Sequence, residues 1–467
     1  MSKVFISHSR TVAGKRLDPE YHYALASIRI ESPYPCVKLL SLAYFKTGGT
    51  PLTTVEEYWG GDLPWVSAKD FKTFRFEDSE DHITELAAKE ATTYVVDKPA
   101  LLMVSRSGIL QHSLPVMVTY KRAAINQDIK AFFPDSRVSV DYLGAYFDLL
   151  GKRLLPLLCK SGATVQSINT NELMNLQVPV PPPDVQRRLV AELDAAYAAK
   201  RKADEKAAEL LASIDDIVLD ALGIPPIPPA DTSLASRIFT VSSREVVDGR
   251  LDAYHYRPYF RKNVERLKCV GCVPLSDIVK LSHEMWDQKE WEDGTSVFPY
   301  LEIGAIDVEF GSVADIVNIP VEEAPSRARM IARQCDLLVS LTRPTRRAIA
   351  FVPMDYEKIV ASTGFSIIRK VAPSIMPEYL SAVLRSEICT LQFDERSSGG
   401  NYPAITEDQL LQCIVPVPSK VVQEKIVATV TEIRAKAKRL KADAQSALVA
   451  TKKCIESGVI GQKENKI

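Results

Sequence analysis

The sequence predicts an α+β protein: two similar α/β lobes joined by two long antiparallel spacer helices that form a coiled coil, with a pseudo-two-fold repeat. Two observations predict this fold class. Short sequence phrases recur 233 to 237 positions apart along the 467 residues, which indicates an internal repeat. Long amphipathic helical patterns occupy the middle and the end of the chain, one in each copy of the repeat.

Length and composition limit the class of protein. With 467 residues, 46% of them hydrophobic, the chain can form two to four domains with separate cores. The 58 Lys and Arg residues balance 59 Asp and Glu residues, so the chain lacks the basic excess of many nucleic-acid binders, and any such role would need locally clustered charge. No apolar run is long enough to cross a membrane and the start carries no secretory leader, so we expect a cytoplasmic protein that binds no membrane. In that reducing compartment the eight cysteines are expected to be thiols.

The repeat can be followed in order. Each lobe opens with a similar phrase, RLDPEYHY at Arg16–Tyr23 and RLDAYHY at Arg250–Tyr256. A second pair of phrases, ALLMVSR from Ala100 and DLLVSLTR from Asp336, has the short apolar pattern of buried strands. Because similar phrases keep a nearly constant offset, we predict two lobes of one fold.

The second half of each lobe repeats at an offset of 237. Val178–Pro181 and Val415–Pro418 both spell VPVP, and Gln186 corresponds to Gln423. Ser161-Gly162 likewise matches Ser398-Gly399. Both copies lead into a long helical pattern, so each lobe is expected to end in a proline-punctuated strand that runs into a long helix.

Within a lobe the local patterns are mixed, which predicts an α+β architecture. Gly48–Pro51 and Trp59–Pro64 have turn chemistry. The predicted strands are Leu63–Ser67, Ala100–Ser105 and Ile129–Phe133. The predicted helices are residues 139–158 and 376–392, where large apolar residues recur at three-to-four spacing.

The central helical pattern has clear ends. Asp184 is a good N-cap after three prolines, and Gly223 followed by IPPIPP is a strong stop signal. At about 1.5 Å per residue, a helix from Asp184 to Leu222 is nearly 60 Å long, which is too long for the core of one lobe. The apolar positions expected to pack this helix and its C-terminal counterpart are Leu189, Leu193, Leu210, Ile214, Ile217, Ile426, Val430 and Ile433.

These patterns divide the chain into five segments. The predicted boundaries are a first lobe at 1–183, a central spacer helix at 184–223, a proline-rich linker with the entry to the second lobe at 224–249, a second lobe at 250–419 and a C-terminal spacer helix at 420–460.

The motifs of the first lobe resemble those of the specificity subunit of type I DNA restriction-modification systems. The phrases that carry the resemblance are GGTP at 48–51, YWGGDLPWVSAKDF at 58–71, LLMVSRSG at 101–108, INQDIKAFFP at 125–134 and SGATVQSINTNELMNLQVPVPPPDVQRRLVAEL at 161–193. The second lobe departs from the pattern, with LSHEMW for GGTP, YLEIGA for WVSAKD and STGFSII for NQDIKAF, but its closing SSGGNYPAITEDQLLQCIVPVP keeps the family's shape.

The resemblance implies a function for each part. The lobes would be target-recognition domains that each read one half of a bipartite site in double-stranded DNA. The helices would set the spacing of the halves and dock methyltransferase subunits, two being expected, and through them restriction subunits. The chain itself would be non-catalytic and bind no cofactor or metal, with S-adenosylmethionine, ATP and Mg on the partner subunits.

Positively charged and amide side chains in loops are the residue types that contact phosphates and base edges. In the first lobe the candidate DNA-binding residues follow or precede predicted strands: Lys69, Lys72, Arg75, Arg106, Lys121 and Arg122. In the second lobe they form the densest cationic cluster of the chain: Arg327, Arg329, Arg333, Arg343, Arg346 and Arg347. A solvated surface is the alternative for any one of them, whereas a proline-bent loop with three arginines at 343–347 favours DNA contact.

Other motifs favour structural interpretations. Cys269 and Cys272 lack a second ligand pair, so we predict no metal site. His22 and His255 are expected to be packed or hydrogen-bonded where each lobe begins. Trp59 and Trp65 are expected in the core. The glycine pairs are not phosphate loops, because no GxxxxGK[ST] follows them.

Two alternatives to a recognition subunit remain open. One is a coiled-coil scaffold that binds only protein, which the near-neutral net charge permits. The other is the recognition part of a fused methyltransferase. The chain lacks both an Asn-Pro-Pro-aromatic tetrad and an FxGxG loop, which disfavours the second alternative.

Overall fold

The computed structural model describes residues 19–27, 32–159, 165–231, 233–246, 250–268, 270–287 and 297–459. The chain divides into two compact units. Unit 1 comprises residues 1–202 and 442–467, and unit 2 comprises residues 203–441. The two long helices contribute to both units, because each unit boundary lies inside one of them.

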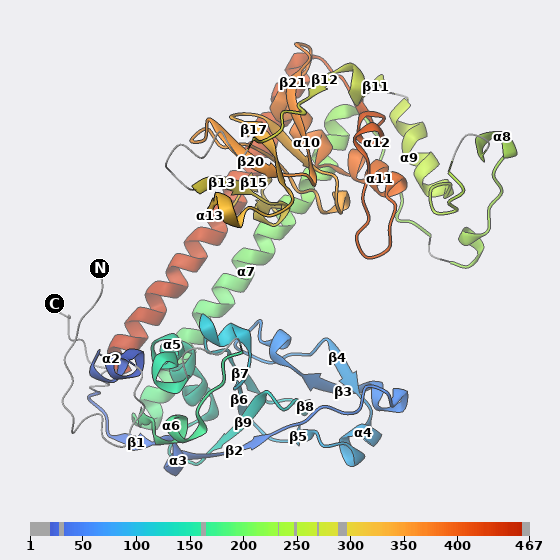
Figure 1. The fold of residues 1–467 in the computed structure, drawn as a ribbon. Coiled ribbons are helices and arrows are strands. Elements are labelled where there is room, and N and C mark those ends of the chain that lie inside the picture. Colours follow the sequence, from blue (N-terminus) through green and yellow to red (C-terminus); the bar gives the residue numbers. More distant parts are fainter. Residues whose placement is uncertain are drawn as a thin grey trace. The chain divides into compact units, whose positions relative to one another are not determined.

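Unit 1 contains two four-stranded sheets and one two-stranded sheet, flanked by helices (Figure 1). The strand orders are β2-β9-β6-β7, β4-β3-β8-β5 and β1-β10. Its elements are α2 (Pro19–Ser27), β1 (Cys36–Lys38), α3 (Leu39–Leu42), β2 (Ala43–Thr47), η1 (Glu56–Tyr58), β3 (Trp59–Val66), η2 (Ala68–Asp70), β4 (Asp81–Ile83), α4 (Glu85–Glu90), β5 (Tyr94–Val96), β6 (Ala100–Val104), η3 (Gly108–Gln111), β7 (Val116–Thr119), β8 (Ala123–Ile125), β9 (Ile129–Pro134), α5 (Val140–Leu158), α6 (Thr170–Asn175), β10 (Gln177–Pro179) and the first half of α7 (Pro183–Leu222).

Unit 2 repeats this topology. Its strand orders are β12-β21-β18-β19, β16-β13-β20-β17 and β11-β22, with β14-β15 as an added hairpin. Its elements are η4 (Ala235–Arg237), α8 (Ser243–Val246), α9 (Pro258–Lys268), β11 (Cys272–Pro274), η5 (Leu275–Asp277), β12 (Val279–Leu281), β13 (Val297–Leu301), η7 (Ile303–Ala305), β14 (Ile306–Asp307), β15 (Ser312–Val313), β16 (Val317–Pro320), η8 (Val321–Glu323), β17 (Ala328–Arg333), β18 (Leu337–Ser340), η9 (Pro344–Arg346), β19 (Ile349–Phe351), β20 (Lys358–Ser362), β21 (Phe365–Val371), α10 (Pro377–Leu384), α11 (Glu387–Arg396), α12 (Glu407–Leu411), β22 (Ile414–Pro416) and the first half of α13 (Lys420–Val459). The predicted repeat of one α+β fold is therefore confirmed.

The core of each unit lies between a four-stranded sheet and a helix. In unit 1 every residue of β6 is buried, as its ALLMV sequence requires of a central strand. Leu143, Phe147 and Leu150 form the buried face of α5, and they belong to the same cluster as Leu101 and Phe132 of the sheet. Complete burial of each large side chain of this kind stabilises the fold by roughly 1.5–3 kcal/mol.

A buried glutamine fixes the start of each long helix. Gln186 accepts a hydrogen bond from the Ser139 backbone N–H at 2.9 Å and donates to the carbonyls of Arg137 and Pro181. Gln423 makes the same three contacts in unit 2, with Met376, Ser374 and Pro418. The 237-residue offset of the sequence repeat therefore reflects one hydrogen-bond network built twice.

Replacing Gln423 by alanine is expected to destabilise unit 2 by about 2 kcal/mol, because it leaves a part-buried N–H and two carbonyls without their partner. Hydrogen exchange of the full chain should then accelerate in α10 and at the start of α13 while unit 1 keeps its protection. Gln177→Ala, which removes an exposed glutamine side chain from β10, serves as the control. Unchanged protection of α10 in Gln423→Ala would refute the assignment.

The two long helices run antiparallel, as predicted. In unit 1 the start of α7 and the end of α13 share a core that contains Leu189, Leu193 and Ile455. In unit 2 the end of α7 and the start of α13 share another core. Of the predicted packing positions, the buried ones are Leu189, Leu193, Ile426 and Val430, and the half-buried ones are Leu210, Ile214, Ile217 and Ile433. Val190, Val218 and Leu219 are buried positions that were not predicted.

Three local predictions were wrong. Asp184 is not the N-cap of the central helix, because α7 already begins at Pro183, where proline's missing N–H costs nothing. Residues 59–64 are not a turn but the first part of β3, and a register shift beside Gly60, with φ of 75°, accommodates the two glycines. The predicted helix 376–392 is interrupted at Arg385 and Ser386 and forms α10 and α11.

Several structural interpretations are confirmed. Trp65 is 8% exposed and its ring N–H donates to the carbonyl of Gly49 at 3.3 Å, while Trp59 packs edge-on against it. His22 is buried, and Nδ1 of His255 lies 3.0 Å from the carbonyl oxygen of Glu395. Gly223, with φ of 66°, ends α7 as expected.

Arg16, Ser161, Gly162 and Cys269 lie outside the described residues. In the part of the chain that the structure describes, no group of three or more His, Cys, Asp or Glu side chains could hold a metal ion. None of the described helices has the length and apolar character needed to cross a bilayer.

Candidate nucleic-acid interface

Four loops of unit 1 gather at one edge of its sheets. The parallel strands β3 and β8 pair Val66 with Ile125, so the loops that follow them emerge side by side. Thr47 at the end of β2 and Val104 at the end of β6 pair with Lys130 and Ile129 at the start of β9. We call this cluster the strand-end edge of unit 1: residues 48–50, 67–72, 105–108 and 126–128.

The glycine pair of the GGTP motif allows two backbones to meet at this edge. A Cβ on Gly48 would lie 1.7 Å from the carbonyl oxygen of Ile125, so only glycine fits there. The Gly49 N–H donates to the same carbonyl at 3.1 Å. Beside it, the Thr50 hydroxyl donates to Oε1 of Gln127 at 2.5 Å. The motif therefore holds the 48–50 loop against the loop after β8.

The SAKD part of the first-lobe motif shapes the loop after β3. Ser67 and Asp70 form a capping box, in which the Ser67 N–H donates to Asp70 Oδ2 at 2.8 Å. Asp70 Oδ1 also accepts from the Glu80 N–H at 3.0 Å. The Asp70 carboxylate thus holds the backbone at Ser67 and Glu80. Lys69, which lies beside Asp70, is exposed.

Unit 2 presents the same edge with different residues. Its strand-end edge comprises residues 282–283, 302–305, 341–347 and 363–364, which follow β12, β13, β18 and β20. The parallel pair β13 and β20 again aligns the strand ends, through Leu301 and Ala361. The Thr363 N–H donates to the carbonyl of Arg327, which brings the start of β17 to the same edge.

The cations at the strand-end edge of unit 1 are all paired with carboxylates. Lys69 Nζ lies 2.8 Å from Asp81, and Lys72 Nζ lies 2.6 Å from Glu80. Arg106 Nε donates to Asp128 at 2.7 Å. These ion pairs are exposed, so each contributes little to stability and can exchange its carboxylate for a phosphate at small cost.

Three other predicted residues of unit 1 lie away from this edge. Arg75 forms ion pairs with Asp141 of α5 and Asp194 of α7, which ties the loop before β4 to two helices. Lys121 and Arg122 precede β8 and so lie at the opposite end of that strand, where Lys121 donates to the Glu77 carbonyl and Arg122 pairs with Glu85.

The predicted arginines of unit 2 fall into two groups. Arg333 lies away from the strand-end edge, opposite Lys358 at the start of β20, and Glu284 pairs with it at 2.5 Å. Arg327, Arg329 and the loop at 343–347 lie at or beside the strand-end edge. Arg329 Nε donates to the Ser326 carbonyl at 2.9 Å. Unit 2 therefore gathers more arginine at its edge than unit 1 does, in agreement with its dense cationic sequence.

Sequence reasoning missed the neutral polar groups at both edges. Thr50 and Gln127 face each other in unit 1, and in unit 2 Tyr402 is 69% exposed beside the 343–347 loop. The available signal was position, because Asn126, Gln127 and Asp128 directly follow a buried strand. Amides and hydroxyls at such a place can donate to and accept from base edges.

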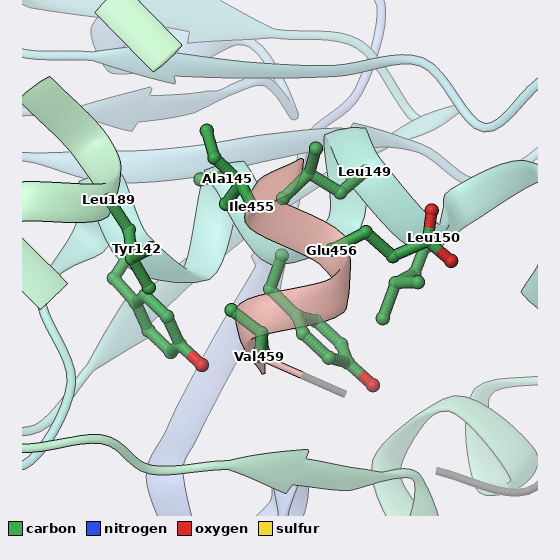
Figure 2. Close-up of a pocket in the computed structure, with 9 residues that line it drawn as sticks. Tyr142, Ala145, Leu149, Leu150, Leu189, Ile455, Glu456 and Val459 are labelled. Atoms are coloured by element: carbon green, nitrogen blue, oxygen red, sulfur yellow. The ribbon is translucent and has the colours of Figure 1, made fainter. Parts of the chain in front are cut away.

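The pocket shown in Figure 2 lies in unit 1 between α5, the start of α7 and the last turn of α13. Its walls are mainly apolar side chains such as Leu149, Leu189 and Ile455. The hydroxyl of Tyr142 already donates to the Pro179 carbonyl, and Glu456 pairs with Arg153. With its polar groups engaged and no residue from the strand-end edge, the pocket is a packing gap between helices.

A model of the type I restriction modification DNA specificity domain matches residues 32–210. The chain is 35% identical over 148 residues to the EcoR124I/EcoR124II specificity subunit of Escherichia coli, which is 32% of this chain and 37% of that protein. It is 27% identical over 170 residues to the MjaIX specificity subunit of Methanocaldococcus jannaschii, covering 35% of this chain and 38% of the relative. The matches thus span well under half of the length of these relatives.

Solved structures with a similar course of the chain include the type I restriction-modification S subunit from M. genitalium. It is 12% identical, with a TM-score of 0.41 over 94% of this chain and 99% of that one. The HsdS subunit from Thermoanaerobacter tengcongensis is 14% identical, with a TM-score of 0.35 over 93% and 98% of the two chains.

Proposed function

We propose that this chain, which belongs through residues 32–210 to the type I restriction-modification specificity family, is the DNA sequence-recognition subunit of a type I restriction-modification complex. The observation that carries the proposal is that the topology of the matched domain is built twice, and that both units gather strand-end loops with cationic side chains at the same edge. Each unit would read one half of a bipartite site.

The strand-end edges supply the chemistry that recognition needs. Lys69, Lys72, Arg106, Arg327 and Arg329 are proposed to contact phosphates, which fixes the position of each unit on the duplex. Thr50 and Gln127 are proposed to contact base edges in the first half-site. Arg75, Arg122 and Arg333 lie away from the strand-end edges, and there their ion pairs with carboxylates of their own unit favour a structural role for these residues.

The long helices are proposed to set the spacing between the half-sites and to dock methyltransferase subunits. Each is continuous over 40 residues, which is about 60 Å of helix. The chain would itself be non-catalytic, while S-adenosylmethionine, ATP and Mg would act on the methyltransferase and restriction subunits.

The proposal is tested with the chain co-expressed with its methyltransferase subunits. We expect the complex to bind a duplex with the motif methylated in the host roughly 10³-fold or more tightly than a scrambled duplex. We also expect affinity to fall steeply with salt, because phosphate contacts release counterions.

Two results would favour other functions. Equal binding of the native and scrambled duplexes at every salt concentration would remove the recognition function. A complex that forms with the methyltransferase but never binds DNA would favour the protein-binding scaffold.

A further inference from the structure

The loop after β18 in unit 2 has an unusual backbone. A single 3₁₀ turn, Pro344–Arg346, is flanked by Arg343 with φ of 49° and Arg347 with φ of 60°. Among the described residues only Cys335 shares this left-handed conformation without being glycine. This conformation is unfavourable in free energy for residues other than glycine, so it persists only where the surrounding structure holds it in place.

Arg343 holds the first end of the turn. Its N–H donates to the Pro403 carbonyl at 2.6 Å, and its guanidinium donates to the Asn401 carbonyl at 3.0 Å. The guanidinium also lies 4.3 Å from the ring centroid of Tyr402. All these contacts join the turn to the 397–404 loop, so Arg343 acts as an anchor and its side chain is already engaged.

Arg347 holds the second end. Its guanidinium lies 2.9 Å from Asp215 of α7, inside unit 2. Its carbonyl accepts a hydrogen bond of 2.7 Å from Arg385, which is only 6% exposed. Arg385 also donates to the carbonyl of Val308 at 2.8 Å, which links the turn to the β14-β15 hairpin.

The position of Arg385 is energetically unfavourable for its side chain. Its Nε atom is buried and has no hydrogen-bond partner among the described residues. Burial, and after it the nearby charges of Arg434 and Arg347, lowers the pKa of Arg385 to about 9. A buried cation with an unpaired donor is unfavourable unless it secures something else. Here the Arg385 side chain holds the backbone of the turn through the carbonyls of Arg347 and Val308.

Arg346 is the residue that this frame presents. It is exposed, its backbone N–H donates to the Arg343 carbonyl, and no described residue forms a hydrogen bond or ion pair with its side chain. Both neighbouring arginines are engaged in holding the turn, whereas Arg346 keeps all its guanidinium donors available. A rigid turn that carries one unpaired arginine is suited to a contact that requires the guanidinium to be at a fixed position.

We propose that Arg346 is the base-reading arginine of unit 2, and that it recognises a guanine through O6 and N7 in the major groove. The inference rests on the proposed DNA-recognition function. A phosphate contact needs only charge within reach, whereas the forked guanidinium on a fixed turn matches the two acceptors of guanine, the commonest specific contact of arginine with a base.

Unit 1 has no counterpart to this residue. Ser107 stands where unit 2 has Arg343, because its N–H donates to the Gln166 carbonyl as Arg343 donates to Pro403. Three positions further on, Leu110 occupies the place of Arg346 and is buried. The guanine contact is therefore specific to the half-site that unit 2 reads, and the two half-sites are expected to differ there.

The test uses the complex of the full chain with its methyltransferase subunits and duplexes that carry the host's methylated motif. Each guanine of the second half-site is replaced in turn by 7-deazaguanine, which lacks the N7 acceptor. We expect one such replacement to weaken DNA binding by the wild-type complex measurably. The same replacement should not change DNA binding by the complex that carries Arg346→Ala. The variant should also lose about 5- to 150-fold of discrimination at that one position, with all other positions unchanged.

Two further variants sharpen the result. Arg346→Lys keeps the charge but not the fork, so it should recover affinity without recovering full discrimination. Lys358→Ala removes one positive charge at the opposite end of β20 and should leave every base preference unchanged.

The assignment of Arg346 would be overturned if Arg346→Ala weakened all duplexes equally and reduced the salt dependence, as the loss of a phosphate contact does. Retention of every base preference by that variant would overturn it as well. In both cases the wild-type complex still prefers its motif, so the proposed function survives. A wild-type complex without any sequence preference would instead remove the proposed function and this inference together.

Discussion

Deleting the seven central residues of both long helices is expected to move the recognised half-sites closer together by about three base pairs. The deletions are Ala199–Glu205 from α7 and Lys436–Ala442 from α13. Seven residues are close to two full turns and about 10 Å, or roughly three base pairs, so the apolar faces stay in phase while the helices shorten. Methylome sequencing of a host that carries the shortened chain reads out the new spacing directly.

The expected effect is large because a bipartite site with the original spacing can no longer engage both units. Binding to that site should fall by at least about 10²-fold, as expected when the contacts of one unit are lost. The control keeps both helices at full length and exchanges the same residues for other alanine, glutamate and lysine combinations, which should preserve the spacing. If the shortened chain methylated the original motif, the helices would not set the spacing.

Replacing Gly48 by alanine is expected to disrupt the strand-end edge of unit 1 and to destabilise that unit by about 3 kcal/mol or more, as severe overpacking does. The new methyl group would lie 1.7 Å from the Ile125 carbonyl oxygen and 2.5 Å from its carbon, so the backbones must separate. That separation would break the hydrogen bond from Gly49 to Ile125. Urea unfolding followed by hydrogen exchange in β8 measures the loss.

Gly108→Ala is the matched control, because it lies at the same edge and an added Cβ there would meet no atom within 4 Å. This variant should unfold as the wild type does. Binding to the first half-site should fall in Gly48→Ala, while its contacts with the second half-site persist. Wild-type stability of Gly48→Ala would show that the GGTP loop can move away from β8 without cost.

The repeat and the helices could be predicted from the sequence because both depend on local, periodic patterns. The offset of 237 between Gln186 and Gln423 indicated two copies of one structure, and the structure explains it by identical contacts to backbone groups. The stop at Gly223 was also visible, because a positive φ after a helix strongly favours glycine.

Local patterns failed where a long-range contact decides the backbone. Residues 59–64 carry turn residues, yet they extend β3, because Trp59, Leu63 and Pro64 pair with β4 on the two sides of a register shift. The break between α10 and α11 was not visible either. Arg385, the C-cap of α10, donates to the carbonyls of Arg347 and Val308, which are distant in sequence.

Within the candidate site, the sequence identified loops rich in cations but not which cations share a surface. Arg75 and Arg106 look alike in the sequence, since each lies in a loop next to a strand. In the structure Arg75 forms ion pairs with Asp141 and Asp194 away from the strand-end edge, whereas Arg106 lies at that edge. The partners of Arg75 lie 66 and 119 residues away, so no local pattern could reveal them.

The sequence by itself determined the doubled α+β fold, the two long helices and the match of residues 32–210 to a specificity-domain model, because periodicity, repeats and motifs are properties of neighbouring positions. Only the tertiary structure decided which side chains are available for the proposed DNA contacts. Arg343, Arg346 and Arg347 are equivalent in the sequence, yet contacts with residues 401–403, Asp215 and Arg385 engage two of them and leave Arg346 exposed. Whether an arginine side chain is available depends on the residues that contact it in the folded unit, and these residues come from distant parts of the sequence.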